Sequence, residues 1–303
     1  MKILPFVIPI VILVTLFHRY SLEIVLKEAQ TGTTLYLFPF ALIAMIASLL
    51  IAASADTLVI RGCCGTPRFR DVLRAKAGSS LLNILGYAVG HSAYAVWVAR
   101  FSGVSAGAAA GMLIFISVSD LTSICTAASL SIAVAGDGVA DPTLSWITFL
   151  LAGSFLLAML GIPLFLTPNP EKRSFLDPWS LLPFRISLTQ VGLRMCQLLI
   201  WILSTSLAAH HFGLQIPLSA FATYLPIVLL VASLPVNVAG FGAVQAVWVH
   251  FFQDYGGAER VLAFQLIWQV LLLGSVVLRG LPFIRRVVDE IDRGQTDTEP
   301  TGQ

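Results

Sequence analysis

The segment Met195–Gln253 reads MCQLLIWILSTSLAAHHFGLQIPLSAFATYLPIVLLVASLPVNVAGFGAVQAVWVHFFQ. Its 59 residues include no aspartate, glutamate, lysine or arginine. A transmembrane helix needs about 20 consecutive, mostly apolar residues to cross the hydrocarbon core of a bilayer. A run of this length therefore holds more than one membrane-embedded helical segment, and it predicts an all-α, polytopic membrane protein.

The composition of the whole chain agrees with this interpretation. Hydrophobic residues make up 57% of the 303 positions and charged residues 11%, whereas a soluble domain carries about 25% charged residues. So little charge cannot solvate a water-facing surface of this size, which excludes a soluble protein. The formal net charge of +2 is also too small to indicate nucleic acid as a partner.

Six further stretches carry no formal charge, or a single one, and most approach the length of a membrane span. They are Ile3–Phe17, Thr33–Ala55, Ala77–Ala99, Phe101–Gly136 (interrupted by Asp120), Pro142–Asn169 and Val261–Leu278. None shows the alternation of apolar and polar residues that is typical of an outer-membrane barrel. The stretches therefore predict a bundle of membrane helices.

Lysine and arginine residues near the ends of spans remain on the cytoplasmic side. In this chain they gather after the second apolar stretch, in the middle of the chain and at its end: Arg61, Arg68, Arg70, Arg74, Lys76, Lys172, Arg173, Arg185, Arg279, Arg285, Arg286 and Arg293. The loop that contains Asp137 and Asp141 has none. This distribution predicts a membrane protein with both termini in the cytoplasm.

This orientation restricts the number of crossings. If both termini are in the cytoplasm, the total number of crossings must be even. Two full crossings in Met195–Gln253 would make the total odd, whereas one crossing and one re-entrant hairpin keep it even. Ala77–Ala99 has the same difficulty because it lies between the basic residues Lys76 and Arg100. Irregular backbone at membrane depth is tolerated where protein or a water-filled cavity surrounds it. We therefore expect about six crossings and two re-entrant hairpins.

Two heptapeptides in these hairpins resemble each other. Ala95–Phe101 (AVWVARF) and Ala246–Phe252 (AVWVHFF) share five of seven residues at an offset of 151. In a chain rich in alanine and valine the match has two interpretations, chance similarity or an inverted repeat. In an inverted repeat, interrupted apolar segments at matching positions indicate the substrate site of a transporter.

The distribution of charged and proline residues also sets the predicted domain boundaries. We expect one transmembrane domain over residues 1–286, with halves at about 1–166 and 184–286. A linker rich in proline and charged residues covers 167–183. The polar composition of 287–303 predicts a disordered cytoplasmic tail.

Asp120 is a carboxylate well inside a long apolar stretch. A charge at that depth costs at least about 2.5–3.5 kcal/mol, so it should face the bundle interior, pair with a cation or be protonated. The residue has two interpretations. It is either a contact for a lipid headgroup or coupling ion, or part of a structural ion pair or a helix contact with Ser117, Ser119 or Thr122.

A second candidate site lies in the segment Pro235–Gln245, PVNVAGFGAVQ. The proline ends the preceding helix, Gly240 and Gly242 free the backbone, and the side chains of Asn237 and Gln245 supply neutral polar groups. Unwound backbone followed by a helix N-terminus can bind an anion such as a phosphate. The alternative is a kinked, tightly packed helix.

Three further polar residues are candidates for lipid binding. Gln265 and Gln269 lie one helical turn apart on the last apolar stretch, which suits either a polar pathway or interhelical hydrogen bonds. Arg100 lies near a span end, where it either anchors the helix at the interface or binds lipid phosphate. The chain has no P-loop and no metal-ligand cluster, so we expect no enzymatic activity, no metal and no other cofactor.

The segment Pro235–Gln245, followed by Tyr255-Gly256-Gly257-Ala258, resembles the signature of the lysylphosphatidylglycerol synthase transmembrane-region family. An earlier part of the chain resembles the first half of that family, through a basic loop followed by Asn83, Gly86, Gly90 and an aspartate-bearing helix at Asp120. The resemblance covers about residues 1–286. It implies a flippase domain that moves a lipid between leaflets, in a stand-alone membrane member without the aminoacyl-transferase domain.

Departures from the family pattern bear on the cargo. Ala239 replaces the first expected glycine, and the Glu-Arg pair expected upstream of Asp120 is missing. Val244 and Gln245 stand where basic and acidic residues are common. The resemblance therefore implies either a phospholipid or a less charged cargo, such as an isoprenoid or hopanoid lipid. The alternative function is a non-transporting membrane partner of a lipid- or glycan-modifying enzyme, and a homo-oligomer is a further arrangement to test.

Overall fold

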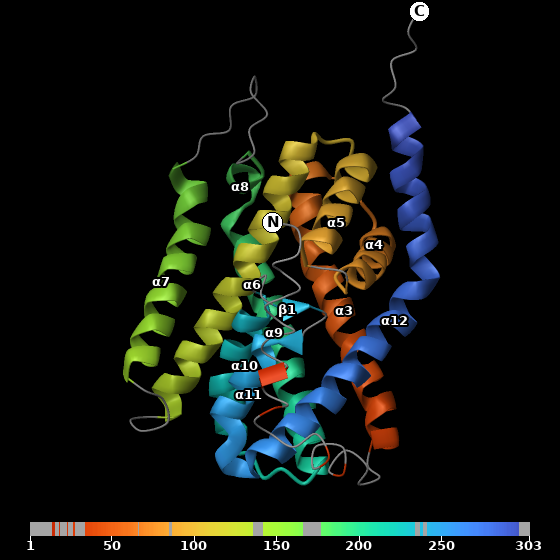
Figure 1. The fold of residues 1–303 in the computed structure, drawn as a ribbon. Helices are drawn as coiled ribbons and strands as arrows, with labels where there is room; N and C mark the ends of the chain where they lie inside the picture. The colour runs from red at the N-terminus through yellow and green to blue at the C-terminus, as the bar shows by residue number, and fades with distance from the viewer. Residues whose placement is uncertain are drawn as a thin grey trace, which may run out of the picture. The chain divides into compact units, whose positions relative to one another are not determined.

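The computed structural model describes residues 34–65, 67–84, 87–135, 142–165, 177–233, 237–238 and 241–296, together with the single positions 14, 15, 18, 23 and 27. Helices account for most of these residues (Figure 1). The longer ones are α3 (Thr34–Cys64), α6 (Ala106–Ala135), α7 (Pro142–Phe165), α9 (Phe184–His211) and α12 (Ala258–Thr296). The shorter elements are α4 (Phe69–Leu82), α5 (Tyr87–Ser102), α8 (Asp177–Leu181), α10 (Leu218–Ala232), β1 (Asn237–Val238), β2 (Phe241–Gly242), α11 (Ala243–Phe252) and η1 (Gln253–Tyr255). The all-α class predicted from the sequence is confirmed.

Four segments of the described chain are long and apolar enough to cross a membrane. They are Tyr36–Cys64, Ala106–Val134, Phe184–His211 and Ala258–Phe283, which lie in α3, α6, α9 and α12. Ser145–Met159 of α7 and Leu218–Ala232 are shorter apolar segments. These lengths and compositions are those of a membrane protein, while six crossings and two re-entrant hairpins remain predictions.

The order of the helices repeats along the chain. A long helix, two short helices and a second long helix follow one another in α3–α6 and again in α9–α12. Corresponding helices begin between 149 and 156 residues apart, at Thr34 and Phe184, Phe69 and Leu218, Tyr87 and Ala243, and Ala106 and Ala258. The two similar heptapeptides lie in the corresponding helices α5 and α11. A shared element order of this length supports a repeat over a chance match, and its inversion in the membrane remains a prediction.

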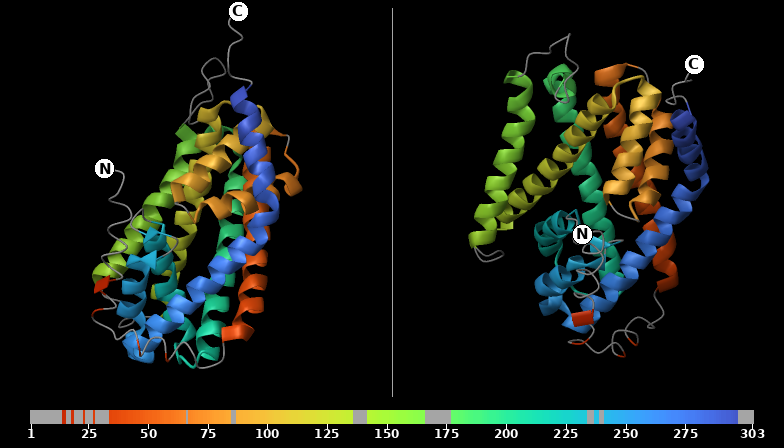
Figure 2. Two further views of the ribbon diagram at one scale, coloured as in Figure 1. Left: turned by 45° about the vertical axis from the view of Figure 1, so that its right-hand side comes forward. Right: turned by 45° about the horizontal axis from the view of Figure 1, so that its top comes forward.

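Each pair of short helices is packed together. α4 packs against α5, and α10 packs against α11 (Figure 2). The four helices contain 14, 16, 15 and 10 residues, fewer than the roughly 20 that a helix needs to cross the hydrocarbon core. Each of these four helices is therefore too short to span the hydrocarbon core by itself.

The chain divides into two compact units. The α10–α11 unit contains α10 and α11 with parts of α3, α6, α7, α9 and α12. The α4–α5 unit contains α4, α5 and α8 with the remaining parts of the same long helices. The divisions within these helices follow Ser48, Thr122, Ala152, Arg194 and Ser275.

Buried apolar side chains of α3, α4, α5, α6 and α8 form the core of the α4–α5 unit. Trp179 of α8 is 3% exposed, and its ring packs edge-on against Phe115 with centroids 5.3 Å apart. Its indole Nε1 donates a hydrogen bond to the carbonyl of Gly111 at 3.1 Å. Part of the segment 167–183, predicted as a linker, is thus helical and holds a tryptophan in the core.

Aromatic side chains form much of the core of the α10–α11 unit. The ring of Trp248 in α11 lies 4.7 Å from that of Phe252 and 5.7 Å from that of Phe264 in α12. Phe221 of α10 packs against both α11 rings. Dispersion and edge-on ring contacts therefore join the short helices of this unit to α12.

The helix α12 continues to Thr296. It therefore extends by ten residues into 287–303, for which a disordered tail is predicted. Pro282 lies inside this helix.

Candidate functional site

Asp56 lies in α3, and its side chain is completely buried. Lys76 of α4 donates from Nζ to Oδ2 of Asp56 at 2.6 Å, and the hydroxyl of Tyr94 in α5 donates to the same oxygen at 3.0 Å. The guanidinium of Arg194 in α9 donates from Nη2 to the other oxygen, Oδ1. Both oxygens of this buried carboxylate are thus occupied by groups from three other helices.

Arg194 also pairs with a second carboxylate. Its Nε lies 2.8 Å from Oδ1 of Asp120 in α6. The side chain of Arg194 is 3% exposed and that of Asp120 is 35% exposed. Arg194 therefore bridges a buried carboxylate of α3 and a partly accessible carboxylate of α6. We refer to Asp56, Lys76, Tyr94, Asp120 and Arg194 together as the Asp56 cluster.

The charges of the Asp56 cluster are balanced. Two carboxylates and two basic groups carry formal charges that cancel. An ionised group that is buried without a partner is strongly unfavourable, and removing one partner of a buried pair destabilises a protein by about 3–5 kcal/mol. The cluster therefore joins α3, α4, α5, α6 and α9 within the α4–α5 unit, and each charged member depends on the others.

Three further interactions lie in or next to the cluster. Gln190 of α9 and Ser119 of α6 are fully buried, and the amide Nε2 of Gln190 donates to Oγ of Ser119 at 3.1 Å. The Tyr94 ring stacks on that of Trp97 with centroids 6.2 Å apart. The ammonium of Lys76 lies 5.2 Å from the centroid of the Tyr94 ring, within reach of a cation–π interaction. These contacts fix the orientations of the groups around Asp56.

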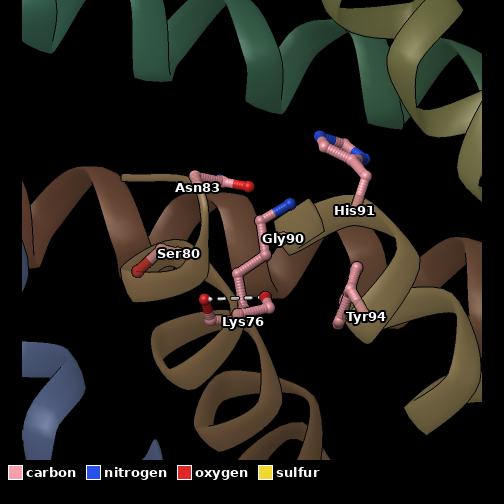
Figure 3. Close-up of a pocket in the computed structure, with 7 residues that line it drawn as sticks. Lys76, Ser80, Asn83, Gly90, His91 and Tyr94 are labelled. Carbon is pink, nitrogen blue, oxygen red and sulfur yellow. Dashed lines mark hydrogen bonds between the residues drawn. The ribbon is translucent and has the colours of Figure 1, made fainter. Parts of the chain in front are cut away.

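A small polar cavity adjoins the cluster between α4 and α5 (Figure 3). Its volume is about 30 Å³, and it is lined by Lys76, Ser79, Ser80, Asn83, Gly90, His91 and Tyr94. A cavity of this volume has room for one or two water molecules. Lys76 and Tyr94 belong both to the cavity wall and to the Asp56 cluster, so the two features share one polar site.

Hydrogen-bond acceptors are prominent in the cavity wall. The hydroxyl of Ser79 donates to the carbonyl of Lys76 at 3.2 Å, and that of Ser80 donates to the carbonyl of Ala77 at 2.8 Å. Each hydroxyl therefore keeps its oxygen lone pairs for accepting. The carbonyl oxygen Oδ1 of Asn83 is buried and has no hydrogen-bond partner in the described chain. A buried amide oxygen without a donor costs about 1–3 kcal/mol.

Gly90 allows the close approach of α5 to the end of α4. A Cβ atom at this position would lie against the side-chain amide of Asn83 and 2.7 Å from the carbonyl oxygen of Ser79. Asn83 lies directly across from Gly90 in Figure 3. The absence of a side chain at Gly90 therefore permits the packing that forms the cavity.

The residues predicted from the sequence occupy different environments. Asp120 belongs to the Asp56 cluster, and the ion pair that was one of its two interpretations is present. Arg100 is exposed near the end of α5. Asp120 is thus paired with Arg194, and its contact with a lipid headgroup stays a prediction.

The remaining candidates belong to the α10–α11 unit. Gln245 is fully buried, and its Oε1 accepts a hydrogen bond from the backbone N–H of Gly242 at 2.6 Å. Gly242 has a φ of +125°, a conformation that favours glycine. Gln265 is 2% exposed, and Gln269 is partly buried.

The segment between α10 and α11 contains the last two candidates. Asn237 lies in β1, where its backbone pairs with Gly242 of β2. Gly240 lies outside the described residues. The interaction of Gln245 with Gly242 places one predicted polar group at the start of α11, where it satisfies a backbone donor and stabilises the turn.

Sequence reasoning missed most of the Asp56 cluster. Asp56 follows the uncharged stretch Thr33–Ala55 directly, so the sequence places it at the end of a span and not inside one. A signal was present, since the apolar residues Leu58, Val59 and Ile60 follow and α3 continues to Cys64. Arg194 directly precedes the uncharged segment Met195–Gln253, a position typical of an arginine at a membrane interface, whereas it is buried between two carboxylates.

No protein-family model matches the sequence, and no curated protein matches it. Among the described residues no group of histidine, cysteine, aspartate and glutamate side chains is arranged to hold a metal ion.

Proposed function

We propose that the protein is a lipid translocase that moves the polar headgroup of a membrane lipid between the leaflets of a bacterial inner membrane. The observation that carries this proposal is a polar cavity next to a buried, charge-balanced cluster in a chain of apolar helices. Ionisable residues within membrane helices are costly, and they mark substrate or ion pathways in membrane proteins. The resemblance to the lysylphosphatidylglycerol synthase transmembrane-region family supports the same function.

The short helices explain why a headgroup could enter the protein. In this proposal α4 and α5, and likewise α10 and α11, form re-entrant hairpins among six crossings. A backbone break at membrane depth is tolerated where it borders protein or water. The cavity lies where α4 ends and α5 begins, and it would take the headgroup while the acyl chains remain in the bilayer.

The Asp56 cluster has a positioning role in this proposal. Asp56 holds Lys76 and Tyr94 in the cavity wall through hydrogen bonds of 2.6 Å and 3.0 Å. Asp120 is the more accessible carboxylate of the cluster, so it is the member that a headgroup can approach. The neutral cluster lets these groups exist in an apolar environment at a moderate energetic cost.

Leaflet exchange in reconstituted vesicles tests the proposal. The purified protein is incorporated into liposomes that contain fluorescent lipids of several headgroup classes, and the fraction bleached by an external reductant is followed. We expect faster exchange than in protein-free vesicles for at least one class, and slower exchange for Asp120→Asn. Asp71→Asn is the matched control, because Asp71 forms a more exposed pair with Arg74 at 3.9 Å.

Exchange at the rate of protein-free vesicles for every lipid class would contradict the proposal. Co-purification with a lipid- or glycan-modifying enzyme in the same preparation would then identify the chain as its non-transporting partner.

A further inference from the structure

We infer that the cavity between α4 and α5 binds the hydroxyl groups of an uncharged headgroup, a sugar or a polyol, in preference to a phosphate. The inference rests on the proposed function for its lipid, and on the cavity lining for its chemistry. The lining consists of Lys76, Ser79, Ser80, Asn83, Gly90, His91 and Tyr94.

The balance of charge disfavours a phosphate. With histidine counted as neutral, Lys76 is the one formally charged residue that lines the cavity. Its ammonium already lies 2.6 Å from the carboxylate of Asp56. A phosphate would have to compete with a fully buried carboxylate for this cation, and its own charge would then lack a counterion among the described residues that line the cavity.

The hydrogen-bonding groups favour a hydroxyl. Ser79 and Ser80 have committed their protons to backbone carbonyls, and Oδ1 of Asn83 has no donor in the described chain. These oxygens need a ligand that donates. A hydroxyl donates one hydrogen bond and accepts others, so it can also accept from Lys76. An ionised phosphate group presents mainly acceptor oxygens, and these would face the acceptors of the cavity wall.

The size of the cavity agrees with this chemistry. A volume of about 30 Å³ holds one or two water molecules. Two neighbouring hydroxyl groups of a sugar or of glycerol can replace two such waters and repeat their hydrogen bonds.

Native mass spectrometry of the full chain tests the inference. The detergent-purified protein is titrated with monoglucosyl diacylglycerol and, separately, with phosphatidic acid, which share a diacylglycerol body and differ in the headgroup. We expect the glucosyl lipid to bind about tenfold more tightly, the factor that corresponds to one well-made buried hydrogen bond or two. Equal binding, or tighter binding of phosphatidic acid, would overturn the inference.

Two substitutions test whether the glucosyl lipid binds in this cavity. Asn83→Leu removes the unpaired acceptor, and Ser80→Ala removes a smaller one with little risk to folding. Each should weaken binding of the glucosyl lipid, Asn83→Leu by about tenfold, and neither should change binding of phosphatidic acid. Thr223→Val is the matched control, because Thr223 of α10 is also buried with a hydroxyl that lacks a partner in the described chain. An unchanged dissociation constant in folded Asn83→Leu or Ser80→Ala protein would overturn the inference.

Different results would contradict the translocase function and the assigned headgroup. Binding of the glucosyl lipid without any leaflet exchange would leave the site in place and contradict translocation. Exchange of phospholipids without preferential binding of the glucosyl lipid would preserve translocation and contradict the assigned headgroup.

Discussion

The helix pairs α4–α5 and α10–α11 occupy the same place in two successive four-helix repeats, and they are stabilised by different chemistry. At the offset of 151 residues both repeats keep a buried tryptophan, Trp97 in α5 and Trp248 in α11. Around Trp97 the polar groups of the Asp56 cluster converge, whereas Trp248 is surrounded by phenylalanine rings. The two helix pairs thus share a buried tryptophan, while in the described chain the Asp56 cluster contacts the first pair alone, through Lys76 and Tyr94, with Arg194 of α9 as a further member.

Three charged residues of the first repeat correspond to apolar residues of the second repeat at the offset of 151. Lys76 corresponds to Ile227 in α10, and Asp120 corresponds to Leu271 in α12. Asp56 corresponds to Leu207 in α9. Packing of aromatic rings does not require charged groups to lose their hydration. Buried ion pairs do carry this desolvation cost, which is high within a membrane. The polar candidate site therefore lies in the first helix pair, whereas the second pair is held by an aromatic core.

Among the substitutions that we propose, that of Asp56 has the largest expected effect on the free energy of unfolding. Asp56→Asn leaves Lys76 and Arg194 without their common carboxylate, and we expect a loss of about 3–5 kcal/mol in the free energy of unfolding. Thermal unfolding in detergent, compared with the more exposed Asp71→Asn, measures it. A change as small as that of Asp71→Asn would show that the cluster does not hold the first helix pair together.

Gly90→Ala tests the close packing of α4 and α5 at the cavity. The added Cβ would lie 2.7 Å from the carbonyl oxygen of Ser79, so α4 and α5 must separate, at an expected cost of about 1–3 kcal/mol in stability. The control is Gly107→Ala in α6, because a Cβ at Gly107 has no neighbour within 4 Å. Equal melting temperatures for the two variants would contradict the close packing at Gly90.

Cysteine accessibility tests the hairpins without a large effect on stability. In a background without Cys63, Cys64, Cys125 and Cys196, single cysteines replace the exposed residues Arg68 and Ala106, which flank α4 and α5. If the pair is re-entrant, a membrane-impermeant maleimide labels both positions from the same side. Labelling from opposite sides would show that the pair crosses.

The same test applies to the second pair. The exposed residues Gln215 and Asp254 flank α10 and α11, and cysteines there should also be labelled from one side. An inverted repeat predicts that this side is opposite to the one from which positions 68 and 106 are labelled.

The sequence predicts the helical class and the interrupted segments because length and apolarity are local properties. The first hairpin was expected to begin at Ala77, whereas α4 begins at Phe69. The reason is that Arg70, Asp71 and Arg74 excluded the first turns of α4 from an uncharged stretch. A short helix that carries charge on part of its surface cannot be recognised by the absence of charge.

The candidate site could be predicted only in part. The depth of Asp120 in an apolar stretch indicates a cation partner, and the composition alone cannot say which one. Arg194 is distant in the sequence, so its pairing with Asp120 and Asp56 depends on how α9 packs beside α3 and α6 within the α4–α5 unit. The cavity also depends on tertiary packing, because Asn83 and Gly90 define it only when α4 and α5 meet.

Lipid translocation through the polar cavity of the first helix pair is the function that we propose. Its most direct test compares leaflet exchange by Asn83→Ala and Thr223→Val, which remove one buried, unpaired polar group from the first and the second pair respectively. We expect Asn83→Ala to slow exchange by about tenfold and Thr223→Val to change it by less than about twofold, with both variants folded. Equal rates for the two variants, or a larger loss for Thr223→Val, would contradict the claim.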